Sequence, residues 1–129
     1  MSKSLPKTEC VVLLAHGSKD PRWRIPFEQI LSAVQDQAGE DRVRLAYMEF
    51  IAPTLTDVAR ACVERGIFNL RVFPLFLAMG AHLATDIPRQ AEEVRAQFPV
   101  LKVEVLKALG EDARVTRLME QIVLEVLNS

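Results

Sequence analysis

The 129-residue sequence has no apolar run long enough to cross a membrane and no block of charges of one sign. A membrane-spanning helix needs about 20 consecutive apolar residues, and the first residues lack the apolar core of a signal peptide. Lys and Arg number 16 against 17 Asp and Glu, so there is no basic stripe of the kind that nucleic-acid binding requires. The sequence therefore predicts a cytoplasmic protein that binds neither membranes nor nucleic acids.

Cysteine and histidine are both scarce, with two of each. Cys10 and Cys62 do not form a metal-binding spacing such as Cys-x-x-Cys. In a chain without a secretion signal, two isolated cysteines are more typical of buried thiols than of a disulfide. Because there are only two histidines, His16 and His82, the place of each in the fold is informative.

Strand-like and helical patterns alternate along the chain, with short connections and no linker. After a loose lead-in at residues 1–7, the expected strands are 10–15, 42–49, 68–73 and 100–106. The expected helices begin at Pro26, at Thr54, at Thr85 or Asp86, and near Glu111, and the last of them could cover the sheet or meet a partner. This alternation predicts one α/β domain over residues 1–129, with a parallel sheet and helices on both faces. The second and fourth strands alternate charged and apolar residues, so we expect them at the edges, in the order 2-1-3-4 of a flavodoxin-like sheet.

Each histidine follows an apolar strand. His16 comes directly after the run 11–15, and His82 follows the third strand and Gly80. Pro88, preceded by residues with capping side chains, is typical of a helix start, which places His82 on the loop before that helix.

The two histidines and Glu49, at the end of the second strand, suit a metal site. Ligands of open α/β sheets bind beyond the carboxyl ends of the strands, where the strand order reverses. We therefore expect His16, His82 and Glu49 within roughly 10 Å of one another. Two imidazoles and one carboxylate favour Co, Ni, Fe or Zn over Mg or Ca. Three ligands leave coordination positions open, as in an exchangeable or catalytic site.

A charged loop follows the first histidine. Its basic residues Lys19, Arg22 and Arg24 are either ordinary surface charge or a clamp for carboxylates, which guanidinium groups bind in a bidentate manner. Gly17 and Gly80 would let a flat ligand approach the backbone at this edge.

Three segments together resemble the small sirohydrochlorin chelatases, which are short class II chelatases related to the cobaltochelatase of cobalamin synthesis. The segments are His16-Gly-Ser-Lys-Asp-Pro-Arg-Trp23, Glu49-Phe-Ile-Ala-Pro-Thr-Leu55, and Pro74-Leu-Phe-Leu-Ala-Met-Gly-Ala-His82 with the following Asp86-Ile-Pro88. The resemblance runs from about residue 10 to residue 127.

The resemblance implies ATP-independent insertion of a divalent metal into sirohydrochlorin, in cobalamin or siroheme-type biosynthesis, by a homodimer without an organic cofactor. The metal is a substrate, Co²⁺ first, with Fe²⁺ or Ni²⁺ as alternatives. His16 and His82 would hold it and take pyrrole protons, with help from Glu49. Sirohydrochlorin carries carboxylates that basic side chains can bind, and the expected substrate-binding residues are Ser18, Lys19, Arg22, Arg24, Gly80 and Arg89.

Two other functions stay open. One is a phosphohydrolase with His16 as nucleophile, although Ala15 stands where such enzymes carry an arginine. The other is a non-catalytic flavodoxin-like module that binds a metal or a tetrapyrrole, although a simple binder does not need two histidines facing one another.

Overall fold

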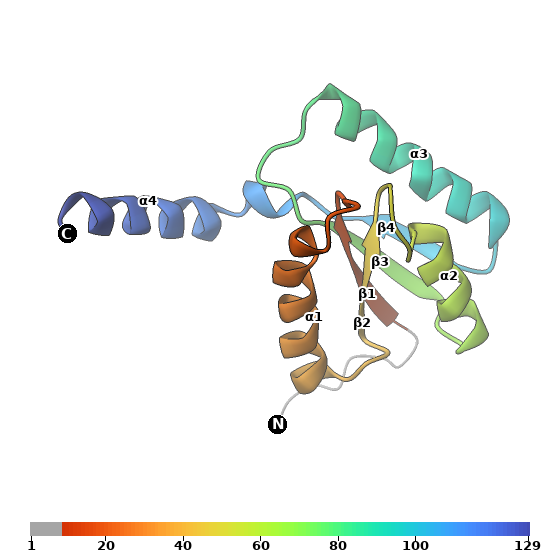
Figure 1. Ribbon diagram of the computed structural model, residues 1–129. Coiled ribbons are helices and arrows are strands. Elements are labelled where there is room, and N and C mark those ends of the chain that lie inside the picture. Colours follow the sequence, from red (N-terminus) through yellow and green to blue (C-terminus); the bar gives the residue numbers. More distant parts are fainter. Residues whose placement is uncertain (1–8) are drawn as a thin grey trace.

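The computed structural model describes residues 9–129, and the predicted lead-in at 1–7 lies outside the described residues. The elements are β1 (Glu9–Ala15), η1 (Pro21–Trp23), α1 (Ile25–Ala38), β2 (Val43–Tyr47), α2 (Leu55–Glu64), β3 (Asn69–Pro74), α3 (Ala81–Gln97), β4 (Lys102–Val105), η2 (Leu109–Glu111) and α4 (Ala113–Leu127). The strands form one parallel sheet in the order β2-β1-β3-β4 (Figure 1). This confirms the predicted strand order, with β2 and β4 at the edges. Of these two, β4 is largely exposed, whereas β2 is buried except at Arg44.

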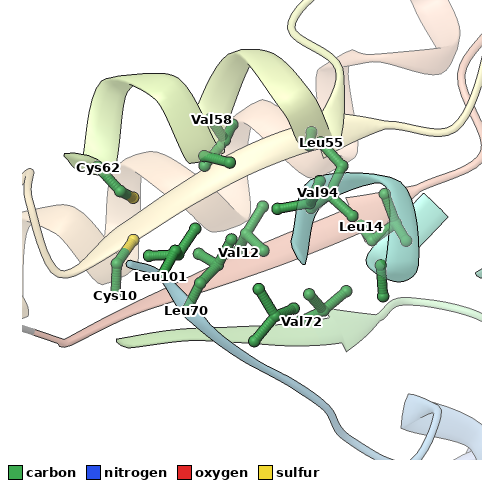
Figure 2. Close-up of a cluster of buried hydrophobic side chains, with 14 of the residues drawn as sticks. Cys10, Val12, Leu14, Leu55, Val58, Cys62, Leu70, Val72, Val94 and Leu101 are labelled. Carbon is green, nitrogen blue, oxygen red and sulfur yellow. The ribbon is translucent and has the colours of Figure 1, made fainter. Parts of the chain in front are cut away.

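One face of the sheet is covered by α2 and α3. Alternate residues of β1, Cys10, Val12 and Leu14, point to this face and are fully buried. Figure 2 shows them between side chains of both helices, among them Val58 of α2 and Val94 of α3. Full coverage of this face supplies most of the hydrophobic stabilisation, because apolar burial contributes roughly 25 cal/mol per Å².

The opposite face is covered by α1 alone. Leu13 and Leu45 are buried there under Phe27 and Leu31 of the helix. No residue of α1 is itself buried. Helices lie on both faces, as predicted, but this second face is only partly covered.

A capping box starts α2, as the sequence predicts. The Thr54 hydroxyl accepts a hydrogen bond from the Asp57 backbone N–H at 3.2 Å, and the Asp57 carboxylate accepts one from the Thr54 N–H at 2.9 Å. Such a cap stabilises a helix by about 1 kcal/mol. It fixes where α2 begins after the loop that carries Glu49.

The start of α3 differs from the prediction. The helix begins at Ala81, not at Thr85 or Asp86, and Pro88 lies inside it. His82 is therefore in the first helical turn and not on a loop. Leu83 packs against the buried core and Ala81 and Ala84 have high helix propensity, so the four extra residues gain more than the one hydrogen bond that Pro88 removes.

The last helix, α4, does not cover the sheet. None of its residues is buried, and it extends away from the body of the molecule (Figure 1). Within residues 9–129, no helix is both long enough and apolar enough to cross a membrane.

Cys10 and Cys62 are free and buried, as predicted. Figure 2 shows their sulfur atoms facing each other from β1 and α2. The hydrogen bond with Cys62 and burial raise the pKa of the Cys10 thiol far above its usual range. These thiols belong to the core and lie away from the histidines.

Candidate active site

The ends of β1 and β2 bring His16 and Glu49 together. The Glu49 backbone N–H donates to the His16 carbonyl at 3.2 Å, which continues the parallel pairing beyond the last strand residues. The side chains meet with His16 Nε2 and Glu49 Oε1 3.3 Å apart, and both are about half exposed. The sequence-based expectation that strand order would place these two residues together is met in this geometry.

Gly17 permits this close approach. Its φ is +96°, a backbone conformation that favours glycine, and a β-carbon at this position would lie 2.1 Å from the Glu49 carbonyl oxygen. The loop after β1 can therefore rest directly on the chain after β2.

Both ring nitrogens of His16 lie near hydrogen-bond acceptors. Nδ1 lies 3.1 Å from the carbonyl oxygen of Gly17, which can only accept a hydrogen bond. Nε2 in turn lies 3.3 Å from the Glu49 carboxylate, which also only accepts. The neutral ring carries one proton, so it can donate to the Gly17 carbonyl or to Glu49, but not to both.

An apolar pocket of about 470 Å³ opens beside His16. We call it the His16 pocket, and it is lined by His16, Gly17, Ser18, Lys19, Trp23 and Phe50. Trp23 is 66% exposed, and the Phe50 ring centre lies 6.3 Å from that of His16. Exposed aromatic rings of this kind can stack against a flat ligand.

Trp23 and Phe50 were not predicted as site residues, although both lie in the segments that carry the family resemblance. Phe50 adopts φ +75°, which is unusual for a residue with a side chain and is frequent at functional sites. For Trp23, its position in a charged loop was the one feature of the sequence that could have indicated a binding site. For Phe50, no feature of the sequence indicates the positive φ that brings it to the pocket.

His82 is held separately on α3. Its Nε2 lies 3.0 Å from the carboxylate of Asp86, one helical turn later, and its side chain is largely exposed. This pair was not predicted, because Asp86 faces His82 only when the helix begins at Ala81. Within residues 9–129, no three His, Cys, Asp or Glu side chains lie close enough together to hold a metal ion.

The predicted basic residues differ in whether their side chains already form ion pairs within the protein. Arg22 binds Asp20 through two parallel contacts, Nε–Oδ1 at 3.0 Å and Nη2–Oδ2 at 2.6 Å, and this guanidinium holds the pKa of Asp20 below its usual range. Arg89 is paired with Asp86 and Glu93.

Lys19 and Ser18 line the His16 pocket, and Lys19 has no ion-pair partner within residues 9–129. The Ser18 hydroxyl accepts a hydrogen bond from the Asp20 N–H at 3.1 Å, which shapes the loop. Arg24 is half-buried, and its Nε is buried without a hydrogen-bond partner in the described chain. Gly80 is the N-cap of α3, with open space at its α-carbon.

The family model for CbiX matches residues 10–126. This chain belongs to the CbiX family. The sirohydrochlorin cobaltochelatase of Sulfurisphaera tokodaii is 31% identical over 119 residues, which cover 92% of this chain and 94% of that protein. The protein of the same name from Saccharolobus islandicus is 30% identical over 127 residues, covering 92% and 95%. The resemblance drawn from the sequence is confirmed.

Solved structures share the fold. The CbiX protein from Marinobacter aquaeolei VT8 has a TM-score of 0.84 and 30% identity, covering 93% of this chain and 98% of that one. The sirohydrochlorin chelatase SirB from Bacillus subtilis, solved in complex with cobalt, has a TM-score of 0.80 at 21% identity. This chain corresponds to 51% of SirB, a likeness of fold alone.

Proposed function

We propose that this protein is a sirohydrochlorin chelatase that inserts Co²⁺ into the macrocycle, with Fe²⁺ and Ni²⁺ as alternative metals. The observation that carries the proposal is the His16–Glu49 pair beside an apolar pocket, in a chain whose CbiX-family relatives are named sirohydrochlorin cobaltochelatases. In the reaction a divalent metal replaces two pyrrole N–H protons, so the site must hold a metal weakly and accept protons.

The spacing of His16 and Glu49 suits two ligands of one metal ion. Imidazole nitrogen and carboxylate oxygen bind first-row metals at about 2.0–2.2 Å, so two ligands at a tetrahedral angle lie about 3.4 Å apart. The observed Nε2–Oε1 separation is 3.3 Å. Two protein ligands on exposed strand ends leave other positions open, which favours transfer of the metal over storage.

Each histidine can leave one ring nitrogen free to bind the metal or to accept a pyrrole proton. In the tautomer that donates from Nδ1 to the Gly17 carbonyl, His16 offers Nε2 either to the metal or to a pyrrole proton. His82 bound through Nε2 to Asp86 would keep Nδ1 free in the same way, since a carboxylate partner orients a histidine ligand. We assign His82 the role of second metal ligand or proton acceptor.

The macrocycle would lie in the His16 pocket against Trp23 and Phe50, with Lys19 available to a rim carboxylate. Arg22, Arg24 and Arg89 remain proposed contacts to the carboxylates of the substrate. Ser18 and Gly80 remain proposed substrate contacts where the ligand comes close to the backbone. Because Arg22 and Arg89 are already ion-paired, each would exchange a protein carboxylate for one of the substrate. Lys19 is therefore expected to contribute more to substrate binding than either arginine.

The homodimer, the absence of an organic cofactor and the cytoplasmic location expected from the sequence stay predictions. A dimer suits the chemistry because the His16 pocket is a single open wall, and a second copy would cover more of a flat ligand.

The test is an anaerobic absorbance assay of sirohydrochlorin with Co²⁺, Fe²⁺ and Ni²⁺ in turn. The wild-type protein should accelerate insertion, most strongly with Co²⁺, and His16→Ala and Glu49→Gln should lose most of this acceleration. Glu64→Gln, at the end of α2, is the matched control and should retain it. Tight binding of sirohydrochlorin without insertion would favour the non-catalytic module, and hydrolysis of a chromogenic phosphate ester would favour the phosphohydrolase.

A further inference from the structure

Two hydrogen bonds hold the peptide unit between Met48 and Glu49 from opposite sides. Its N–H, on Glu49, donates to the His16 carbonyl at 3.2 Å. Its carbonyl, on Met48, accepts a hydrogen bond from the side-chain amide of Gln90 at 3.2 Å. The N–H and C=O of a trans peptide point in opposite directions. This peptide unit is therefore fixed between the end of β1 and helix α3.

The backbone alone directs the Glu49 side chain. The carboxylate is about half exposed, and within residues 9–129 His16 is its only polar partner. The Glu49 carbonyl rests against Gly17, which has no side chain to interfere. The direction in which the Glu49 side chain leaves the backbone therefore depends on how the peptide units around it are held.

Gln90 lies on the same helix as His82. The two residues are eight positions apart, which is about 12 Å along the axis of α3. Buried apolar side chains hold α3 on the sheet, but apolar packing is non-directional and does not orient a carbonyl group. Among residues 9–129, the bond from Gln90 to Met48 is the one hydrogen bond between α3 and the loop after β2. It joins the helix that carries His82 to the loop that carries Glu49.

The Gln90 side chain does not belong to the substrate pocket. It is half-buried and is not among the residues that line the His16 pocket. A methionine would fill nearly the same space without donating a hydrogen bond. What the amide adds at this position is therefore the bond to the Met48 carbonyl.

We propose that Gln90 is a positioning residue of this chelatase, which keeps the Glu49 carboxylate aimed at His16 by holding the Met48 carbonyl from α3. The inference rests on the proposed function, because it concerns how the metal site of that reaction is kept in place. Gln90 acts through Glu49 and does not line the pocket. A partner that orients a metal ligand typically changes metal affinity or activity by about 10–100-fold.

The first experiment measures insertion of Co²⁺ into sirohydrochlorin by Gln90→Met, which keeps the length of the side chain but cannot donate. Its kcat should fall about tenfold, with the KM for sirohydrochlorin within about twofold of wild type because the pocket is untouched. Gln97→Met, at the exposed last position of α3, is the matched control and should behave as wild type. A wild-type kcat in Gln90→Met with a native circular dichroism spectrum would overturn the positioning role.

A double-mutant cycle shows whether the effect passes through Glu49. In the Glu49→Gln background the side chain no longer supplies a carboxylate, so adding Gln90→Met should lower the residual rate less than about twofold. A further loss of about tenfold would mean that Gln90 acts elsewhere, and would overturn the proposal. Gln90→Glu keeps the shape of the side chain, but its ionised carboxylate cannot donate, so it replaces Gln90→Met if that variant does not fold.

Titration with Co²⁺ alone, followed by visible absorbance, separates this inference from the proposed function. Gln90→Met should bind Co²⁺ about tenfold more weakly than the wild-type protein and Gln97→Met. Equal affinities would overturn the positioning role. A wild-type protein that binds Co²⁺ without inserting it would overturn the proposed function alone, because the titration still tests Gln90. A wild-type protein that does not bind Co²⁺ would overturn both.

Discussion

A β-carbon on residue 17 would occupy the position of the Glu49 carbonyl group, at 2.1 Å from its oxygen. Gly17→Ala should therefore push the two loops apart and separate His16 from Glu49. Because a misplacement of about 1 Å can cost roughly 100-fold in rate, we expect a loss of that order in metal insertion with little change in circular dichroism. Gly66→Ala, after α2, is the control, since Gly66 also has a positive φ of +75° but no atom lies within 4 Å of an added β-carbon. Equal activity of the two variants would show that the close approach at Gly17 is unimportant.

Trp23 contacts the substrate in the proposed pose without touching the reacting nitrogens. Trp23→Ala should raise the KM for sirohydrochlorin about tenfold with a smaller change in kcat, because a remote contact acts almost equally in the ground and transition states. Trp23→Phe should recover most of the binding, since it keeps an aromatic face. Steady-state kinetics of both variants test this, and a fall in kcat alone would place Trp23 elsewhere in the mechanism.

His82 lies in a helix, so it can be replaced without disturbing a loop. His82→Ala should cut the insertion rate strongly and leave the fold intact, because alanine has high helix propensity. Asp86→Asn should have a smaller effect, since the amide can still position the ring but does not hold a charge beside it. Glu92→Gln, later in α3 and paired with Arg95, is the control. Wild-type rates in folded His82→Ala would remove His82 from the site.

At the scale of the elements, η2 decides where α4 points. A β-carbon at Gly110 would lie 1.7 Å from the Leu77 carbonyl oxygen, so Gly110→Ala must move either η2 or the loop after β3. We expect the melting temperature to fall by several degrees, because overpacking of this kind typically costs about 1–3 kcal/mol. Thermal melts of Gly110→Ala beside Gly80→Ala measure this, and an unchanged melting temperature would mean that the contact of η2 with the loop after β3 is unimportant.

Local sequence signals located most elements well but failed at α3. The capping pair Thr54 and Asp57 is decisive because both partners are three residues apart, and it placed the start of α2 correctly. At α3 the residues Thr85, Asp86 and Pro88 form an equally plausible start. Packing of Leu83 on the core and the helix propensity of its neighbours outweigh that signal. The shift moved His82 into the helix and brought Asp86 beside it.

At the scale of the whole molecule, the predicted homodimer would link folding to association. If only folded chains dimerise, mass action stabilises the folded state as the concentration rises. The melting temperature of the wild-type protein should therefore increase by a few degrees between about 1 and 100 µM. A wild-type melting temperature independent of concentration would contradict a stable dimer.

The sequence by itself determined the sheet and one half of the site. Charged residues alternating with apolar ones in the second and fourth strands predict that these strands lie at the edges, and the observed order β2-β1-β3-β4 has them there. That order alone brings the ends of β1 and β2 together, and with them His16 and Glu49.

Only the tertiary structure decided the pairing of His82 with Asp86, the aromatic wall of the pocket and the outward course of α4. Each depends on contacts between segments far apart in the chain or on a backbone angle that no local pattern encodes. Phe50 reaches the pocket through a positive φ, and α4 leaves the body because Gly110 rests on the chain around Leu77.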